Sequence, residues 1–322
     1  MNRGRLTGLL AITVTSLLWG TTGTAATFAP DVGPLAIGAF ALGVGGLLQA
    51  ALAVPALRTA CPALRQCRRV VIMGAIAVAI YPLAFYSSMH IAGVAVGSVV
   101  SLASAPLASG VLERVIDHRP LSRWWVIAAT LGIIGSALLC ISKFEGQAGS
   151  AADTLVGIGL GLLAGLTYAS YSWASHRLMS TGISRGASMG AVFGGGGLLL
   201  MPVLILTGAP LLASAQNAAV GAYMALVPMF LGYLLFGYGL TKVPASTATT
   251  VTLTEPAIAT MLAVLIIGEQ LTGLGWIGLT VIAAVLLILA VTPTNAEPPK
   301  TPPQRKPGGG RPRRSGADVL IG

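Results

Sequence analysis

The chain has 322 residues, of which 55% are hydrophobic and only 9% are charged, and its formal net charge is +10. So few charged side chains exclude a soluble globular protein and indicate a protein with several membrane spans. The positive charge does not indicate nucleic-acid binding. The basic residues are confined to short loops and a tail, where membrane topology explains them better. No nucleic-acid partner is expected.

Ten apolar segments follow one another along the chain. Each is long enough for a helix that crosses the hydrocarbon core, and none shows the alternating pattern of a barrel strand. The sequence therefore predicts an all-α membrane protein with ten transmembrane helices. The predicted spans cover residues 6–28, 34–54, 70–88, 91–112, 124–142, 155–175, 187–206, 218–240, 244–267 and 273–291.

The basic residues fall on one side of the membrane when these spans are placed with the N-terminus inside. All 19 lysines and arginines except Lys143 are then cytosolic, which is the distribution found in membrane proteins. We expect a multi-pass protein of the plasma (inner) membrane with both termini in the cytosol. Residues 293–322, rich in proline, glycine and basic residues, are expected to form a disordered cytosolic tail.

The three cysteines and three histidines form neither a disulfide framework nor a metal-binding pattern. Cys61 and Cys67 fall in an arginine-rich segment that is expected to be a cytosolic loop, and the histidines lie in separate loops. We therefore expect no metal and no cofactor.

The two halves of the chain resemble each other. Pro106 aligns with Pro256 at an offset of 150 residues, and Trp19-Gly20 aligns with Tyr168-Ala169 at an offset of 149. Five spans per half is an odd number, so the second half must be inverted relative to the first. The sequence predicts two inverted five-helix repeats, residues 1–150 (spans 1–5) and 151–292 (spans 6–10). A binding site is expected near the midplane, where the repeats meet.

A pattern with recognisable chemistry occupies the end of the second half. Glu255-Pro256 is followed by an apolar run, then Gly268-Glu269, a polar turn and a glycine-rich helix. This order resembles the end of a repeat of the EamA family in the drug/metabolite transporter (DMT) superfamily. The first half keeps the proline and the glycine-rich helix, but Ala105 stands at the position of Glu255. The resemblance implies a ten-span secondary transporter of small metabolites, often an exporter.

Glu255 is a charged residue inside an apolar span, where a charge costs about 2.5–3.5 kcal/mol on insertion scales. It lies about twelve residues, or about 18 Å, into its predicted helix and so near the midplane. One interpretation is a protonated carboxyl hydrogen-bonded nearby, for example to Thr252. A second is a carboxylate in a wet cavity that binds a cationic group of the substrate or a coupling proton. A third is structural, with the carboxyl bound to carbonyls freed by Pro256.

Other polar side chains in the spans are candidates for the wall of a substrate path. A tyrosine hydroxyl or an indole N–H in the membrane needs a partner, which a cavity or a substrate provides. Hydroxyls spaced by three or four residues share a helix face. The competing explanations are ring packing and hydroxyls bonded to carbonyls of their own helix. The candidate site residues are Trp19, Tyr81, Tyr86, Ser101, Ser104, Tyr168, Tyr171, Thr252, Thr254, Glu255 and Pro256.

We predict a secondary active transporter that carries amino acids or other neutral, zwitterionic or cationic solutes by alternating access. No Lys or Arg lies within a predicted span to neutralise a phosphate group, and no phosphate-binding loop for ATP is present. Coupling to a proton or substrate gradient remains. An enzyme is not expected, because the spans contain no nucleophile with a base and no metal-ligand motif. A receptor or scaffold that transports nothing is the alternative, and a homodimer stays open.

Overall fold

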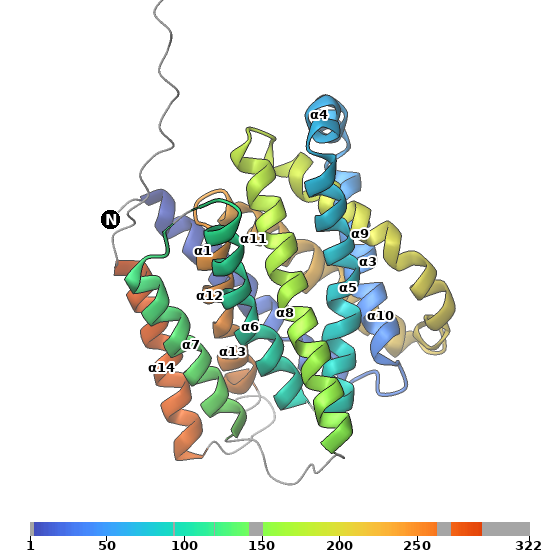
Figure 1. The fold of residues 1–322 in the computed structure, drawn as a ribbon. Coiled ribbons are helices and arrows are strands. Elements are labelled where there is room, and N and C mark those ends of the chain that lie inside the picture. Colours follow the sequence, from blue (N-terminus) through green and yellow to red (C-terminus); the bar gives the residue numbers. More distant parts are fainter. Residues whose placement is uncertain (1–2, 93, 119, 142–150, 263–271, 292–322) are drawn as a thin grey trace, which may run out of the picture. The chain divides into compact units, whose positions relative to one another are not determined.

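The computed structural model describes residues 3–92, 94–118, 120–141, 151–262 and 272–291. These residues are almost entirely helical, which confirms the all-α prediction for the described part of the chain (Figure 1). The predicted tail and the segment with Gly268 and Glu269 lie outside it. The first half contains α1 (Arg3–Gly20), α2 (Thr22–Ala26), α3 (Pro34–Leu52), α4 (Val54–Gln66), α5 (Arg68–Ala92), α6 (Val94–Val115) and α7 (Arg123–Ile141).

The second half begins at α8. Its elements are α8 (Ala151–Ser180), α9 (Arg185–Thr207), η1 (Ala209–Leu212), α10 (Ala215–Met224), η2 (Ala225–Leu231), α11 (Gly232–Leu240), α12 (Ala245–Val251), η3 (Thr252–Thr254), α13 (Glu255–Leu262) and α14 (Gly273–Val291).

Helices occupy all ten predicted segments within the described residues. Among the residues that the structure describes, six stretches have both the length and the hydropathy needed to cross a membrane, and α7 and α14 contain shorter apolar stretches. The six are Arg3–Ala26, Pro34–Leu52, Arg68–Ala92, Ala152–Ser180, Arg185–Thr207 and Ala215–Leu240. The structure thus supports a multi-pass membrane protein, and the count of ten spans stays a prediction.

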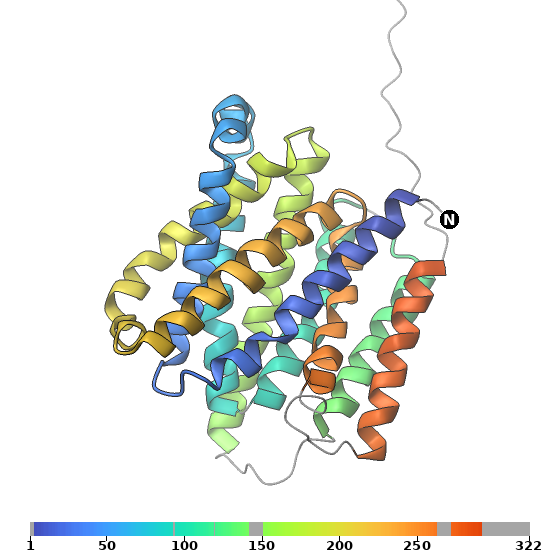
Figure 2. The ribbon, with the colours of Figure 1, turned by 180° about the vertical axis from the view of Figure 1, so that it is seen from behind.

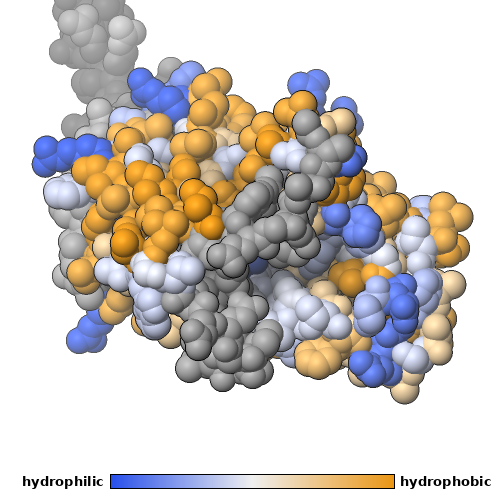
Figure 3. Space-filling model, turned by 90° about the horizontal axis from the view of Figure 1, so that it is seen from below, coloured by the Kyte–Doolittle hydropathy of each residue, from blue (hydrophilic) through white to orange (hydrophobic). Residues whose placement is uncertain are grey.

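The outside of the helices is largely apolar. Figure 3 shows hydrophobic residues over much of the described surface in that view. Large aliphatic side chains are exposed on several helices, among them Leu162 on α8, Leu198 on α9 and Leu287 on α14. Exposed apolar surface of this extent marks contact with lipid or a partner.

Cys61, expected in a loop, lies in a helix, α4, so the loop prediction is wrong for most of this segment. Cys67 caps the C-terminal end of α4. Side chains on one face pack against the bundle, whereas Arg58 and Arg65 on the other face are exposed. The apolar face of α4 therefore covers the bundle, and its arginines face outward. The packed side chains are Ala56, Leu57, Ala60, Ala63 and Leu64. Arginines within the segment lower its mean hydropathy and hide this periodic apolar face.

Pro256 interrupts the helix that carries Glu255. The backbone is α-helical up to Val251, passes through the 3-10 turn η3, and resumes as α13 at Glu255. Pro256 has no N–H to donate to the Thr252 carbonyl, which instead accepts the backbone N–H of Glu255. The break therefore places a carboxyl group at the first residue of a helix, inside a predicted span.

A second interruption separates α10 from α11, where η2 is a π-helical segment that contains Pro228. The Pro228 carbonyl accepts the Nε1–H of Trp19 at 2.9 Å, so the irregular backbone binds a side chain of α1. π-Helical insertions occur often at functional sites. Because α1 packs against η2, η3 and α13, it lies next to both interruptions. Figure 2 shows α1 beside the helix formed by α10, η2 and α11.

The contacts between helices are symmetric with respect to the two halves. A contact between two spans has an equivalent contact between the corresponding spans of the opposite halves. α3 packs against α9, α6 against α12, and α7 against α14, and each pair joins corresponding predicted spans of the two halves. α5 packs against α8, which joins span 3 to span 6, and α1 packs against α11, which joins span 1 to span 8. The contact of α6 with α8 likewise has its counterpart in the contact of α12 with α1.

Candidate functional site

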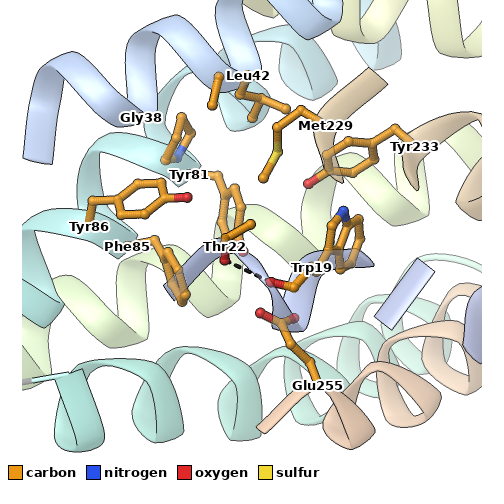
Figure 4. Close-up of a pocket in the computed structure, with 12 residues that line it drawn as sticks. Trp19, Thr22, Gly38, Leu42, Tyr81, Phe85, Tyr86, Met229, Tyr233 and Glu255 are labelled. Atoms are coloured by element: carbon orange, nitrogen blue, oxygen red, sulfur yellow. Dashed lines mark hydrogen bonds between the residues drawn. The ribbon is translucent and has the colours of Figure 1, made fainter. Parts of the chain in front are cut away.

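A narrow cavity lies among α1, α2, α3, α5, η2, α11 and α13 (Figure 4). The space open to the centres of water-sized molecules is about 20 Å³, which is room for one or two waters. Most of the lining is aromatic or aliphatic, and it contains one carboxyl group. The lining residues are Trp19, Thr22, Gly38, Ala41, Leu42, Tyr81, Pro82, Phe85, Tyr86, Met229, Tyr233 and Glu255.

Glu255 directs its carboxyl group into this cavity, toward Trp19 and Thr22 (Figure 4). The Thr22 hydroxyl donates to the Trp19 carbonyl at 2.7 Å. Within the described part of the chain the Glu255 carboxyl forms no hydrogen bond and no ion pair, and no lysine or arginine lines the cavity. A carboxyl group in largely apolar surroundings is costly to leave without a partner. The arrangement can accept a cation or a proton.

Thr252, one turn before Glu255, is engaged elsewhere. Its hydroxyl donates to the Thr249 carbonyl at 2.9 Å and lies 2.8 Å from the Tyr168 hydroxyl. A hydroxyl has one hydrogen to donate, so Tyr168 is the donor of the second bond. These two bonds hold Tyr168 behind the cavity. They also satisfy the hydrogen-bonding capacity of the Thr252 hydroxyl, so Thr252 is not a hydrogen-bond partner of Glu255.

Trp19 is held from several sides. Its ring centroid lies 4.8 Å from that of Tyr233 and 5.4 Å from that of Phe236. Tyr168, its predicted counterpart in the second half, meets it edge to face at 6.1 Å. Such tilted and edge contacts are the preferred arrangement of aromatic pairs. The residue that the repeat predicts on a substrate path thus lines the cavity in one fixed orientation.

Tyrosines close the remaining sides. The Tyr81 ring lies 5.5 Å from Tyr168 and 5.6 Å from Tyr171, and the Tyr171 and Tyr233 hydroxyls are 2.7 Å apart. Figure 4 shows the hydroxyl groups of Tyr86 and Tyr233 directed inward from opposite sides. Tyr171 is fully buried and lies behind the lining.

The predicted site residues divide into groups. Trp19, Tyr81, Tyr86 and Glu255 line the cavity, and Pro256 creates the break at Glu255. Tyr168, Tyr171 and Thr252 lie behind the lining, as described above. The other three hydroxyls are bonded to carbonyls of their own helices and do not belong to the lining formed by described residues. Ser101 donates to Gly97, Ser104 to Ser101 and Thr254 to Val251, at 2.7, 3.2 and 2.7 Å.

Several lining residues had no signal in the sequence. Gly38, Leu42 and Met229 are apolar residues in apolar helices, where nothing separates a residue that lines a cavity from one that faces lipid. Tyr233 had a signal, because it is a tyrosine within a predicted span. Its position beside Trp19 depends on the packing of α11 against α1.

Two carboxylates at the end of α6 bind the other half of the chain, and neither was predicted from the sequence. Glu113 is only 4% exposed and accepts the backbone N–H of Ser246 at 3.0 Å and its hydroxyl at 2.6 Å. These bonds cap the N-terminus of α12, where a negative charge is favourable. Asp117, just beyond α6, accepts the Trp173 Nε1–H at 2.8 Å and pairs with Arg177 at 3.2 Å.

Replacing Glu113 with alanine is expected to lower the free energy of unfolding by about 2–3 kcal/mol, because two buried donors of Ser246 lose a charged acceptor. Ser246→Ala removes only the hydroxyl bond and should cost less. Unfolding of the purified protein in detergent micelles measures both. Equal stability of Glu113→Ala and the wild type would contradict the capping role.

Comparison with known proteins places the chain in a family. The model of the EamA-like transporter family matches it twice, over residues 6–141 and 155–291. The chain belongs to the EamA-like transporter family. As an EamA transporter it is a multi-pass membrane protein that transports a small-molecule substrate.

Related proteins agree with this membership. An uncharacterized transporter of Bacillus subtilis (strain 168), YwfM, is 33% identical over 286 residues, which are 88% of this chain and 94% of that protein. An uncharacterized transporter of Clostridium kluyveri is 29% identical over 151 residues, 45% of this chain and 47% of that protein. A solved crystal structure of a protein with 19% identity shares the fold of this EamA transporter, with a TM-score of 0.71 over 88% of this chain and 95% of that one.

Proposed function

We propose that this EamA transporter is a secondary carrier of small solutes with an ammonium group, zwitterionic or cationic, and that Glu255 binds this group. The observation that carries the proposal is the Glu255 carboxyl, directed into an aromatic cavity and without a hydrogen-bond or ion-pair partner among the described residues. A carboxylate attracts an ammonium group strongly where water is scarce. The same lining, without lysine or arginine in the described chain, disfavours phosphorylated solutes.

The aromatic rings support the same solute class. Ring faces attract cations, with about 0.5–2 kcal/mol for each well-placed contact. Trp19, Tyr81, Phe85 and Tyr233 all line the cavity. A solute whose ammonium group binds Glu255 would place neighbouring methylene groups against these rings. A neutral solute would use the rings but not the carboxyl, so it is the second choice.

The proposed mechanism is alternating access between two inverted five-helix repeats in ten spans. The exchange symmetry of the helix contacts supports it, as does a cavity lined by helices of both halves. The cavity is too narrow for a metabolite, so the mechanism requires helices to part before a solute enters. We place the carrier in the plasma (inner) membrane with both termini cytosolic, from the distribution of basic residues.

Energy coupling is proposed to use the same carboxyl group. A proton and an ammonium group compete for Glu255. If the solute is released on one side of the membrane and the proton on the other, the carrier exchanges solute for protons. Export follows from this exchange when protons flow inward, and it is the direction common in the family that the sequence resembles. Tyr168, Tyr171 and Thr252 are proposed to hold the cavity in shape, and a homodimer is not needed for this cycle.

Flux measurements in vesicles test the proposal. The purified full-length protein is reconstituted in liposomes with a pH gradient, and labelled zwitterionic, cationic, neutral and phosphorylated solutes are offered in turn. We expect solutes with an ammonium group to accumulate and to dissipate the gradient, and phosphorylated solutes to stay outside. Preferential flux of phosphorylated solutes would contradict the proposal. Binding without flux for every ammonium solute would favour the receptor alternative.

A further inference from the structure

Four arginines surround a pocket that is separate from the cavity at Glu255. Arg65 lies near the end of α4, Arg68 and Arg69 begin α5, and Arg177 lies in the last turns of α8. The space open to the centres of water-sized molecules is about 500 Å³, enough for a sizeable polar group. The pocket lies on the side that the basic residues assign to the cytosol.

The positive charge of this pocket is not balanced by the described residues. Arg177 pairs with Asp117 at 3.2 Å, but no ion pair to Arg65, Arg68 or Arg69 occurs within the described chain. The first turn of α5 contains no acidic residue, and the pocket lining among described residues contains none either. Like charges that line one pocket repel one another. An anion bound among them would relieve this repulsion.

We propose that this pocket binds the phosphate of an anionic phospholipid, such as phosphatidylglycerol, from the adjacent leaflet. Arginine matches phosphate with paired hydrogen bonds, and basic pockets between membrane helices bind lipid head groups. The proposal concerns a site apart from Glu255 and does not depend on the proposed substrate.

The structure favours a lipid over a free phosphate because an apolar track begins at the pocket. Arg68, Ile72 and Ile76 are four residues apart, so they share one face of α5. Ile72 and Ile76 are 56% and 46% exposed. A phosphate at Arg68 would therefore set its acyl chains along these two isoleucines.

Lipid retention by the purified full-length protein tests this site. Native mass spectrometry counts bound phosphatidylglycerol and phosphatidylcholine after extraction in a neutral detergent. The test variant combines Arg65→Gln, Arg68→Gln and Arg69→Gln. The control variant combines Arg3→Gln, Arg58→Gln and Arg114→Gln, which removes the same charge from residues outside the pocket lining. Soluble glycerol phosphate is added as a competitor in a parallel series.

We expect the wild type and the control variant to retain phosphatidylglycerol over phosphatidylcholine, and the pocket variant to retain on the order of tenfold less of it. Equal loss in both triple variants would show general attraction to anionic lipid and overturn the site. Displacement of the lipid by glycerol phosphate at equal concentration would assign the pocket to a soluble phosphate instead.

Two further variants keep the proposal testable if the triple variant does not fold. Arg68→Gln alone should reduce phosphatidylglycerol retention severalfold. Ile72→Ser with Ile76→Ser should reduce it too, while leaving all four arginines in place. Wild-type retention in both would overturn the proposal.

Discussion

Glu255→Gln is expected to reduce gradient-driven transport by about tenfold to a hundredfold, with folding and membrane abundance unchanged. Glutamine keeps the shape of the side chain but cannot ionise, so it loses the charged attraction for an ammonium group. An interaction of this kind contributes about 1.5–3 kcal/mol. Flux into vesicles, normalised to the amount of folded protein, measures the effect, and the dependence of flux on the pH gradient is recorded in the same experiment.

Glu113→Gln is the matched control. It also neutralises a glutamate within a helix of the bundle, but Glu113 binds Ser246 and does not line the cavity of the described residues. Its flux per folded molecule should stay close to that of the wild type even if its stability falls. Wild-type flux with unchanged pH dependence in Glu255→Gln would reject the binding role and leave Glu255 as a structural partner of Pro256.

A single methyl group at Gly46 is expected to destabilise the crossing of α3 with α9. A Cβ added to Gly46 would overlap the backbone carbonyl of Phe193, and a backbone atom cannot move aside as a side chain end can. Overpacking of this kind costs about 1–3 kcal/mol. Gly46→Ala should therefore lower the unfolding midpoint of the purified protein and reduce its yield in the membrane.

Gly159→Ala provides the control for this substitution. Gly159 lies in α8, and nothing stands within 4 Å of the place where its Cβ would be. Alanine there should be neutral or add up to about 1 kcal/mol of helix stability. A Gly46→Ala protein as stable as Gly159→Ala would mean that α3 and α9 do not approach as closely as the structure places them.

The sequence predicted where the helices lie better than it predicted which helix faces line a cavity. Membrane helices need long apolar runs, so the runs alone located ten helical segments. Ser101 and Ser104 show the limit. Their spacing assigned them to one face, but whether a hydroxyl points to a cavity or to its own backbone depends on neighbouring helices. The sequence contains no record of those neighbours.

Charged and aromatic residues could be predicted as site candidates because they are expensive or rare in a span. Glu255 and Trp19 stood out for this reason, and the structure brings them to one cavity. Glu113 was not predicted as a buried carboxylate because it follows the predicted end of its span by one residue. Its burial comes from the N-terminus of α12, 133 residues further along the chain.

The long separation between α1 and its partners has a consequence for biosynthesis. Trp19 donates to a carbonyl 209 residues away. The Thr15 hydroxyl lies 3.0 Å from the Ala11 carbonyl of its own helix and 3.1 Å from the Gly232 carbonyl, 217 residues away. At a synthesis rate of about 5–20 residues per second, roughly 10–40 s pass before those acceptors leave the ribosome. During this interval the newly inserted α1 lacks these two acceptors. The Thr15 hydroxyl still has the Ala11 carbonyl of its own helix. The Trp19 indole N–H, whose acceptor is the Pro228 carbonyl, must find a temporary one in lipid head groups, water or the insertion machinery.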